Sequence, residues 1–229
     1  MLTLLHTAQS NVAVFDALWQ ELAPDIEVQH LVADDILQEA RDAGRANAKL
    51  NYHVSEIYAT LGNRFEFVLC TCSTIGEIAE RASMRYSFPV LRVDRPMATH
   101  AIDIGERVAV LATLKSTLEP TRDLLKSIAQ RSGKSVYIDE ILCVGAWEFL
   151  EKGDISGYAQ AIAREIDVYS RSHDVIVLAQ ASMAVAAELR PDNKVPVLSS
   201  PRTGFETAVA QYRLYHAAQQ KKNALEPTA

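Results

Sequence analysis

Short apolar segments alternate with amphipathic segments along the whole chain, and this alternation is typical of an α/β protein. Each apolar segment has the length of a strand and ends in small or polar residues. The segment that follows carries apolar residues three or four positions apart, as at Val14, Leu18 and Leu22, which predicts a helix. Strands are predicted at residues 2–5, 26–32, 65–70, 89–93, 108–111, 135–142, 175–178 and 196–198, with helix ends at Gly44 and before the Gly62-Asn63 turn, and a last helix from Pro201 to about Gln220.

The second hundred residues repeat the order of the first. Leu5-His6-Thr7 corresponds to Leu111-Ala112-Thr113, and Pro89-Val90-Leu91 corresponds to Pro196-Val197-Leu198. The pattern therefore predicts the α/β class, with two pseudo-symmetric Rossmann-like halves, each on a parallel sheet, and a site in the cleft between them. We assign residues 1–95 plus 202–229 to the first half, on which the last helix packs back, and residues 96–201 to the second half.

Four polar loops each follow a strand and begin a helix. In an open parallel sheet, ligands bind outside the carboxyl ends of the strands. A helix start also offers free N–H groups and a positive dipole end, which favour an anion such as a carboxylate. Ser, Thr and Asn are the usual N-cap residues too, so each loop taken alone is explained as well by capping. The candidate binding residues in the four loops are Thr7, Ser10, Asn11, Ser73, Thr74, Thr113, Ser116, Thr117, Gln180 and Ser182.

Cys72 is the candidate catalytic residue. It stands at a strand-to-helix junction, where the field of the helix start favours a thiolate and predicts a lowered pKa. A thiol with a pKa near neutrality can remove a proton from the carbon α to a carboxylate, or protonate the carbanion that a decarboxylation leaves. Cys70 and Cys143 lie in apolar runs and are predicted to be small buried hydrophobes.

Composition and charge narrow the classes of function. Hydrophobic residues make up 48% of the chain and charged residues 23%, as in a folded globular protein. The net charge is −6 and no basic cluster exceeds Lys221-Lys222, so we expect no nucleic-acid partner. The sequence has neither a secretion signal nor an apolar run of membrane-spanning length, so we expect a cytoplasmic protein without a membrane partner. The cysteine spacing predicts no metal site, and Arg92, Arg95 and Lys115 are expected to be solvated.

The layout, with the segments Cys72-Ser73-Thr74 and 112–117, resembles the aspartate/glutamate/hydantoin racemase superfamily over essentially the whole chain. The resemblance implies an enzyme of amino-acid metabolism that needs no cofactor, acts on a small carboxylate and often forms a homodimer or a higher homo-oligomer. It implies two cysteines facing each other across the substrate, of which Cys72 is the first. It also implies binding roles for Ser73 and Thr74, for Thr113 with Ser116 or Thr117, and for Thr7, Ser10 and Asn11.

The chain departs from the family at the second cysteine. The family motif aligns Gln180 with that position and the internal repeat aligns Ala181, and neither side chain can carry a proton. One hypothesis is a racemase or epimerase whose second proton comes from water, His6 or His53. Another is a one-cysteine decarboxylase that resembles arylmalonate decarboxylase; maleate isomerase, a further relative, uses two cysteines. A protein that binds a small carboxylate without converting it is the third alternative.

Overall fold

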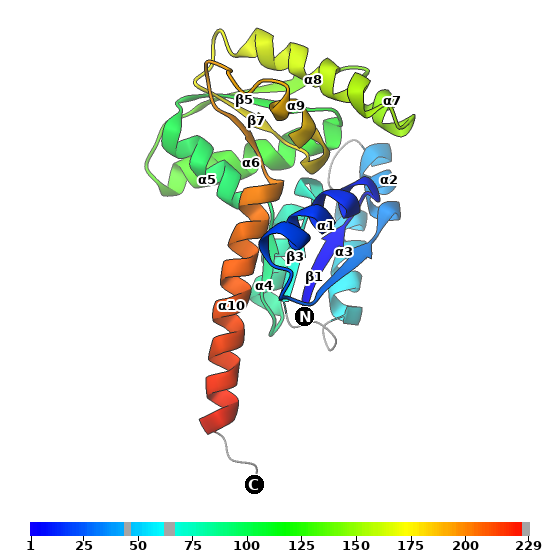
Figure 1. The fold of residues 1–229 in the computed structure, drawn as a ribbon, viewed down its shortest axis with the longest axis vertical. Helices are drawn as coiled ribbons and strands as arrows, with labels where there is room; N and C mark the ends of the chain where they lie inside the picture. Colours follow the sequence, from blue (N-terminus) through cyan, green and yellow to red (C-terminus); the bar gives the residue numbers. More distant parts are fainter. Residues whose placement is uncertain (44–46, 62–66, 226–229) are drawn as a thin grey trace.

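The computed structural model describes residues 1–43, 47–61 and 67–225, which form two four-stranded parallel sheets with helices on their faces (Figure 1). The first sheet contains β1 (Leu2–His6), β2 (Val28–Val32), β3 (Phe67–Cys70) and β4 (Val90–Arg92). The second contains β5 (Arg107–Ala112), β6 (Tyr137–Leu142), β7 (Val175–Leu178) and β8 (Val197–Ser199). The helices are α1 (Ser10–Leu22), α2 (Asp34–Ala43), α3 (Ala48–Leu61), α4 (Gly76–Arg85), α5 (Arg95–Ile104), α6 (Lys115–Arg131), α7 (Ala146–Glu151), α8 (Ile155–Tyr169), α9 (Ala184–Glu188) and α10 (Pro201–Leu225), with 3-10 turns η1 (Ser73–Ile75) and η2 (Ala181–Met183).

The two sheets have equivalent topologies, β2-β1-β3-β4 and β6-β5-β7-β8, which confirms the two-half fold that the repeat predicts. All the strand pairs are parallel, and β1 and β5 hold the same place in their sheets. Parallel strands end at the same edge, so the loops after β1 and β3 lie together, as do those after β5 and β7.

The central strands form the core because helices cover both faces of each sheet. Every residue of β1, β3 and β7 is buried, as expected for a parallel sheet enclosed on two sides. In β2 and β6, at the edges of the sheets, buried positions are fewer. This difference explains why the central strands appear in the sequence as continuous apolar runs.

The last helix returns to the first half. In Figure 1, α10 runs from the second half down along β3 and α4, and it contacts α1, α5 and β3. Phe205 meets Phe15 of α1 edge-on, and Tyr212 meets Phe67 of β3 in the same way, with ring centroids 6.4 and 5.7 Å apart. Aromatic packing of this kind buries large apolar areas. The exact boundaries of the two halves stay a prediction.

Several element ends differ from the predictions. The second strand begins at Val28 rather than Ile26, and α10 runs to Leu225 rather than to Gln220. The predicted breaks at Gly44 and Gly62-Asn63 lie outside the described residues, as does the start of the third predicted strand. Among the described helices, none has the length and apolar character to cross a bilayer.

Candidate active site

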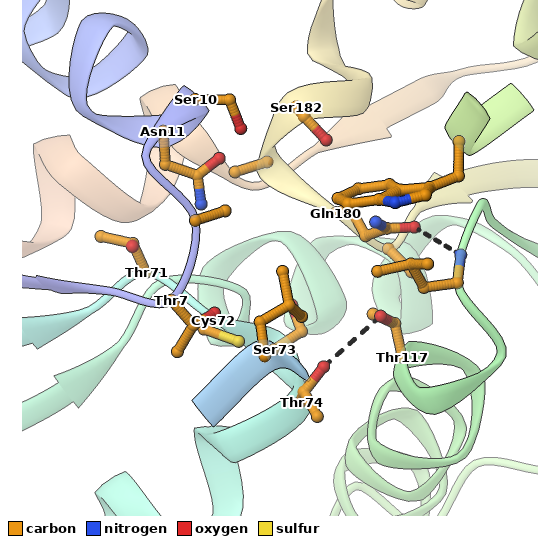
Figure 2. A pocket seen from close by; sticks show the side chains of 16 residues that line it. Thr7, Ser10, Asn11, Thr71, Cys72, Ser73, Thr74, Thr117, Gln180 and Ser182 are labelled. Atoms are coloured by element: carbon orange, nitrogen blue, oxygen red, sulfur yellow. Dashed lines mark hydrogen bonds between the residues drawn. The ribbon is translucent and has the colours of Figure 1, made fainter. Parts of the chain in front are cut away.

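A cavity of about 40 Å³ lies between the two halves at the carboxyl edges of both sheets. All the predicted site residues line it except Thr113 and Ser116. Figure 2 shows Cys72, Ser73 and Thr74 from the first half near Thr117 and Gln180 from the second, with Ser10, Asn11 and Ser182 on the opposite side. The fold thus brings all four predicted loops to one cavity.

The structure identifies Gln180 as the counterpart of Cys72. The backbone N–H of Thr71 donates to the carbonyl of Leu5, and the N–H of Ala179 donates to the carbonyl of Leu111, so positions 71 and 179 are equivalent. The next residue in each half is extended and precedes a 3-10 turn: Cys72 before η1 and Gln180 before η2. The alignment of Ala181 with Cys72 was therefore wrong by one residue.

Hydrogen bonds converge on the sulfur of Cys72. The hydroxyls of Thr7 and Thr74 and the backbone N–H groups of Thr74 and Ile75 all act to lower the pKa of the thiol. Burial has the larger effect and raises the pKa of Cys72 above its ordinary value. The lowered pKa that the sequence predicts was therefore wrong for this closed arrangement, because the sequence does not show how completely the two halves enclose the thiol.

Capping does not account for the polar loops. The N-cap positions of α1, η1, α6 and η2 are Gln9, Cys72, Leu114 and Gln180, and none of the four makes a side-chain cap hydrogen bond. Ser10 is the first residue of α1, and Ser116 and Thr117 lie inside the first turn of α6 rather than before it. The cavity-facing hydroxyls are thus not consumed by helix ends.

Ser73 is tied to a buried ion pair below the cavity. Asp94 accepts from Nε of Arg92 at 2.6 Å and from Nη2 at 2.9 Å, and it also makes a side-chain hydrogen bond with Ser73. Burial acts to raise the pKa of Asp94, but the charge and hydrogen bonds of Arg92 outweigh it, so the pKa is lowered and the carboxylate is ionised. An ionised carboxylate only accepts, so Ser73 donates to Asp94 and offers the cavity an oxygen acceptor rather than the donor that the sequence suggests. The expectation that Arg92 is solvated was wrong, because this guanidinium is buried.

Gln180 presents its amide N–H₂ group to the cavity. Its side-chain oxygen accepts from the backbone N–H of Thr113 at 2.6 Å, from the Thr113 hydroxyl at 3.0 Å and from the N–H of Leu114 at 3.2 Å. These three donors assign the amide orientation. Thr113 therefore holds Gln180 instead of lining the cavity. The buried hydroxyl of Ser116 has no hydrogen-bond partner within the described part of the chain and does not line the cavity either.

Two contacts complete the frame of the site. The Oγ1 atoms of Thr74 and Thr117 lie 3.4 Å apart and join the two halves (Figure 2). The hydroxyl of Tyr158 lies 2.9 Å from that of Ser182, and burial raises the pKa of this tyrosine to about 12, so it stays protonated. Tyr158 lies on the apolar face of α8, where the sequence carries no sign of a contact with the site.

The cavity has walls that the sequence analysis missed. Trp147 and Leu37 contribute large side chains, and both come from segments after the second strand of a half. The predicted site covers only the loops after the first and third strands of each half. Since β2 and β6 end at the same edge as their neighbours, the parallel topology itself was the signal that could have identified these two residues.

The two histidines considered as second acids do not line the cavity. His6 is fully buried, with Nδ1 2.8 Å from the Thr71 hydroxyl and Nε2 3.0 Å from His30, and burial lowers its pKa to about 4. His53 lies beside Glu39 on α2.

Cys70 and Cys143 are buried free thiols, as predicted. Within the described residues that line the cavity, Cys72 is thus the only proton-carrying side chain of the thiol, imidazole, carboxyl or amine type. No cluster of His, Cys, Asp and Glu in the described ranges could hold a metal ion.

The fold resembles those of several solved structures. A glutamate racemase from Bacillus anthracis has 14% sequence identity and a TM-score of 0.67, over 93% of this chain and 82% of that one. An allantoin racemase from Pseudomonas fluorescens has 15% identity and a TM-score of 0.60, over 93% and 91%. A mutant of arylmalonate decarboxylase in a sulfate-associated form has 14% identity and a TM-score of 0.52, over 94% and 93%.

These structural likenesses show a shared fold. No curated protein sequence matches the chain. The sequence model of the family described as Asp/Glu/Hydantoin racemase matches residues 7–208, which span both sheets and all four polar loops. The chain therefore belongs to the Asp/Glu/Hydantoin racemase family.

Proposed function

We propose that this protein transfers a proton at the carbon next to a carboxylate of a small molecule, without a cofactor, and that Cys72 is its acid and base. One observation carries the proposal: the sole cavity-lining thiol receives hydrogen bonds from Thr7, Thr74 and Ile75. Such donors stabilise a thiolate once it forms. Membership of a racemase family supports the same reaction class.

The reaction follows from the donors around the cavity. The substrate carboxylate accepts from the amide of Gln180 and the hydroxyl of Thr117. The Cys72 thiol first gives its proton to solvent water. The resulting thiolate then takes the α-proton, so that the C–H bond breaks, an S–H bond forms and the electron pair moves into the carboxylate as an enediolate. Fixed donors stabilise this developing charge. Return of the proton from the thiol restores the C–H bond.

The face opposite Cys72 determines the stereochemical outcome. Gln180 can donate hydrogen bonds there but cannot deliver a proton. We therefore expect exchange of the α-proton with retained configuration, and inversion only where water supplies the second proton. A Gln180→Cys variant supplies a second thiol at the equivalent position, and we expect it to increase inversion relative to exchange.

Decarboxylation is the second candidate. The raised pKa of Cys72 supports it, because the thiol stays protonated and can donate. A decarboxylation also needs only one proton-carrying group, and Cys72 can be that group. The bond from the α-carbon to one carboxylate breaks, carbon dioxide leaves, and the resulting carbanion takes the thiol proton. Water then reprotonates the thiolate.

The test is proton NMR in deuterated water with amino acids, hydantoins, hydroxy acids and arylmalonates. Cys72→Ala is the active-site variant, and Cys143→Ala is the matched control because that cysteine is buried outside the cavity. We expect the α-proton signal to disappear with the wild type and Cys143→Ala only. Equal loss with Cys72→Ala would refute the role of the thiol. Release of carbon dioxide without exchange favours decarboxylation, and saturable binding without either reaction favours the carboxylate-binding alternative.

A further inference from the structure

Trp147 lies at a junction between the two halves. Its indole lines the cavity, and its Nε1 donates to Oε1 of Glu151 at 2.7 Å. The same carboxylate oxygen is 2.9 Å from Nη1 of Arg41, and the Arg41 guanidinium carbon lies 5.3 Å from the centroid of the indole ring. Arg41 belongs to α2 of the first half, whereas Trp147 and Glu151 belong to α7 of the second, and α2 and α7 face each other in Figure 1. One three-residue contact therefore spans the cleft at a cavity wall.

We propose that Trp147 is a gate to Cys72 and a wall that limits substrate size, held closed by Arg41 and Glu151. The proposal rests on the proposed function for the identity of what passes the gate, but access to the thiol is a property that can be measured without turnover. We refer to Arg41, Trp147 and Glu151 together as the latch.

The helix α7, which carries Trp147 and Glu151, is short and mostly exposed. It has six residues, of which only Ala146 is fully buried, and Phe149 and Glu151 face solvent. Gly145 and Gly153 flank it with φ values of 78° and 74°, a conformation that L side chains rarely adopt. Elements with few buried contacts open at low free-energy cost, and small flanking residues absorb the backbone rotation. The glycines at both ends would allow α7 to move as a unit.

A second hollow lies directly outside the gate. It has a volume of about 440 Å³, and it shares Thr7, Ala8 and Leu37 with the inner cavity. Arg41 lines this outer hollow, while Trp147, on which it stacks, lines the inner one. Opening the latch would join the two spaces. The closed cavity of about 40 Å³ has room for a few waters, whereas small-molecule pockets typically measure about 300 Å³ or more, so a substrate requires this opening.

The test measures the rate at which iodoacetamide, and the bulkier N-ethylmaleimide, alkylate Cys72, with the site located by mass spectrometry. The variants are Arg41→Ala, Glu151→Ala and Trp147→Phe, which keeps a ring but loses the hydrogen bond to Glu151. Arg213→Ala is the control because it also removes an arginine from an inter-element ion pair, a more exposed one with Asp25, away from the cavity. We expect alkylation to be about tenfold faster in Arg41→Ala, because this variant loses an exposed ion pair and a cation–π contact that hold the gate closed. The increase should be larger for N-ethylmaleimide than for iodoacetamide, because the bulkier reagent needs a wider opening.

The double variant Arg41→Ala/Glu151→Ala separates a latch from two unrelated effects. We expect its acceleration to be smaller than the product of the two single accelerations, since both changes break the Arg41–Glu151 ion pair. Wild-type rates in both single variants, or the same acceleration in Arg213→Ala, would overturn the proposal. Faster alkylation in the latch variants, together with no α-proton exchange by the wild type in the NMR experiment, would support the gate and refute the proposed reaction. Turnover by the wild type, together with unchanged alkylation in the latch variants, would support the reaction and refute the gate.

Discussion

The buried ion pair below the cavity gives a sharp prediction about stability. Asp94 is fully buried and the Arg92 side chain is 3% exposed, and the two meet through two hydrogen bonds. Asp94→Asn keeps the shape of the side chain but leaves the guanidinium in the interior without its main counter-charge. Removing one partner of a buried pair costs about 3–5 kcal/mol. The partly exposed Glu80, 3.6 Å from Arg92, compensates only partly. We expect a loss of about 3 kcal/mol in the free energy of unfolding.

Urea denaturation measures this loss, and the chain provides a matched control. Arg190 also donates two hydrogen bonds to one carboxylate, that of Asp167, and each is 2.6 Å long, but both of these side chains are partly exposed. Asp167→Asn should cost no more than about 1 kcal/mol, because water screens exposed pairs. Replacing both buried partners, in Arg92→Met/Asp94→Asn, should recover part of the loss. Equal effects of Asp94→Asn and Asp167→Asn would refute the reasoning that burial makes the first pair critical.

Three further predictions concern other parts of the molecule. Burial lowers the pKa of His6 to about 4, so the unfolded chain binds more protons than the folded chain below pH 6.5. The free energy of unfolding, measured by urea denaturation, should therefore fall between pH 6.5 and 4, by about 3 kcal/mol at the acid end, and less in His6→Gln. Gly204→Ala should lower the thermal midpoint, although Ala normally favours helices, because its Cβ would overlap the Val93 carbonyl; an unchanged midpoint would contradict the close approach. The pH profile of Cys72 alkylation should have its midpoint above that of an ordinary cysteine thiol, because burial raises the pKa, and higher still in Thr7→Val. A midpoint below that of an ordinary thiol would show that burial does not dominate.

The sequence predicted the parts of the site that follow from parallel topology. Loops after neighbouring parallel strands must meet at one edge, so polar residues such as Thr7, Cys72 and Thr117 could be grouped before the structure was known. The apolar segments that recur in the second half predicted the second parallel sheet in the same way as the first. Each of these inferences needs only the local pattern and the rule that the strands run the same way.

The parts that could not be predicted depend on how the halves face each other. The burial that raises the pKa of Cys72 comes from closure of the cleft. The inward turn of Arg92 depends on Asp94, which is close in sequence but whose burial is a tertiary property. Trp147 lies in a short, mostly exposed helix with no local sign that one face closes a cavity. Contacts between distant elements, rather than periodicity, determine all three.

The two halves of the site keep the same frame but hold different chemistry. Thr7 donates to Cys72 in the first half, and its counterpart Thr113 donates to Gln180 in the second. The supporting hydroxyl is thus present on both sides, but on one side it holds a group that can exchange a proton and on the other an amide that can only donate hydrogen bonds. A pseudo-symmetric cleft with two equivalent acids is suited to moving a proton from one face of a carbon to the other. With one acid replaced by an amide, the same cleft is suited to exchange on a single face. Retained configuration is therefore the outcome that the asymmetry of Cys72 and Gln180 favours, whichever carboxylate the cavity accepts.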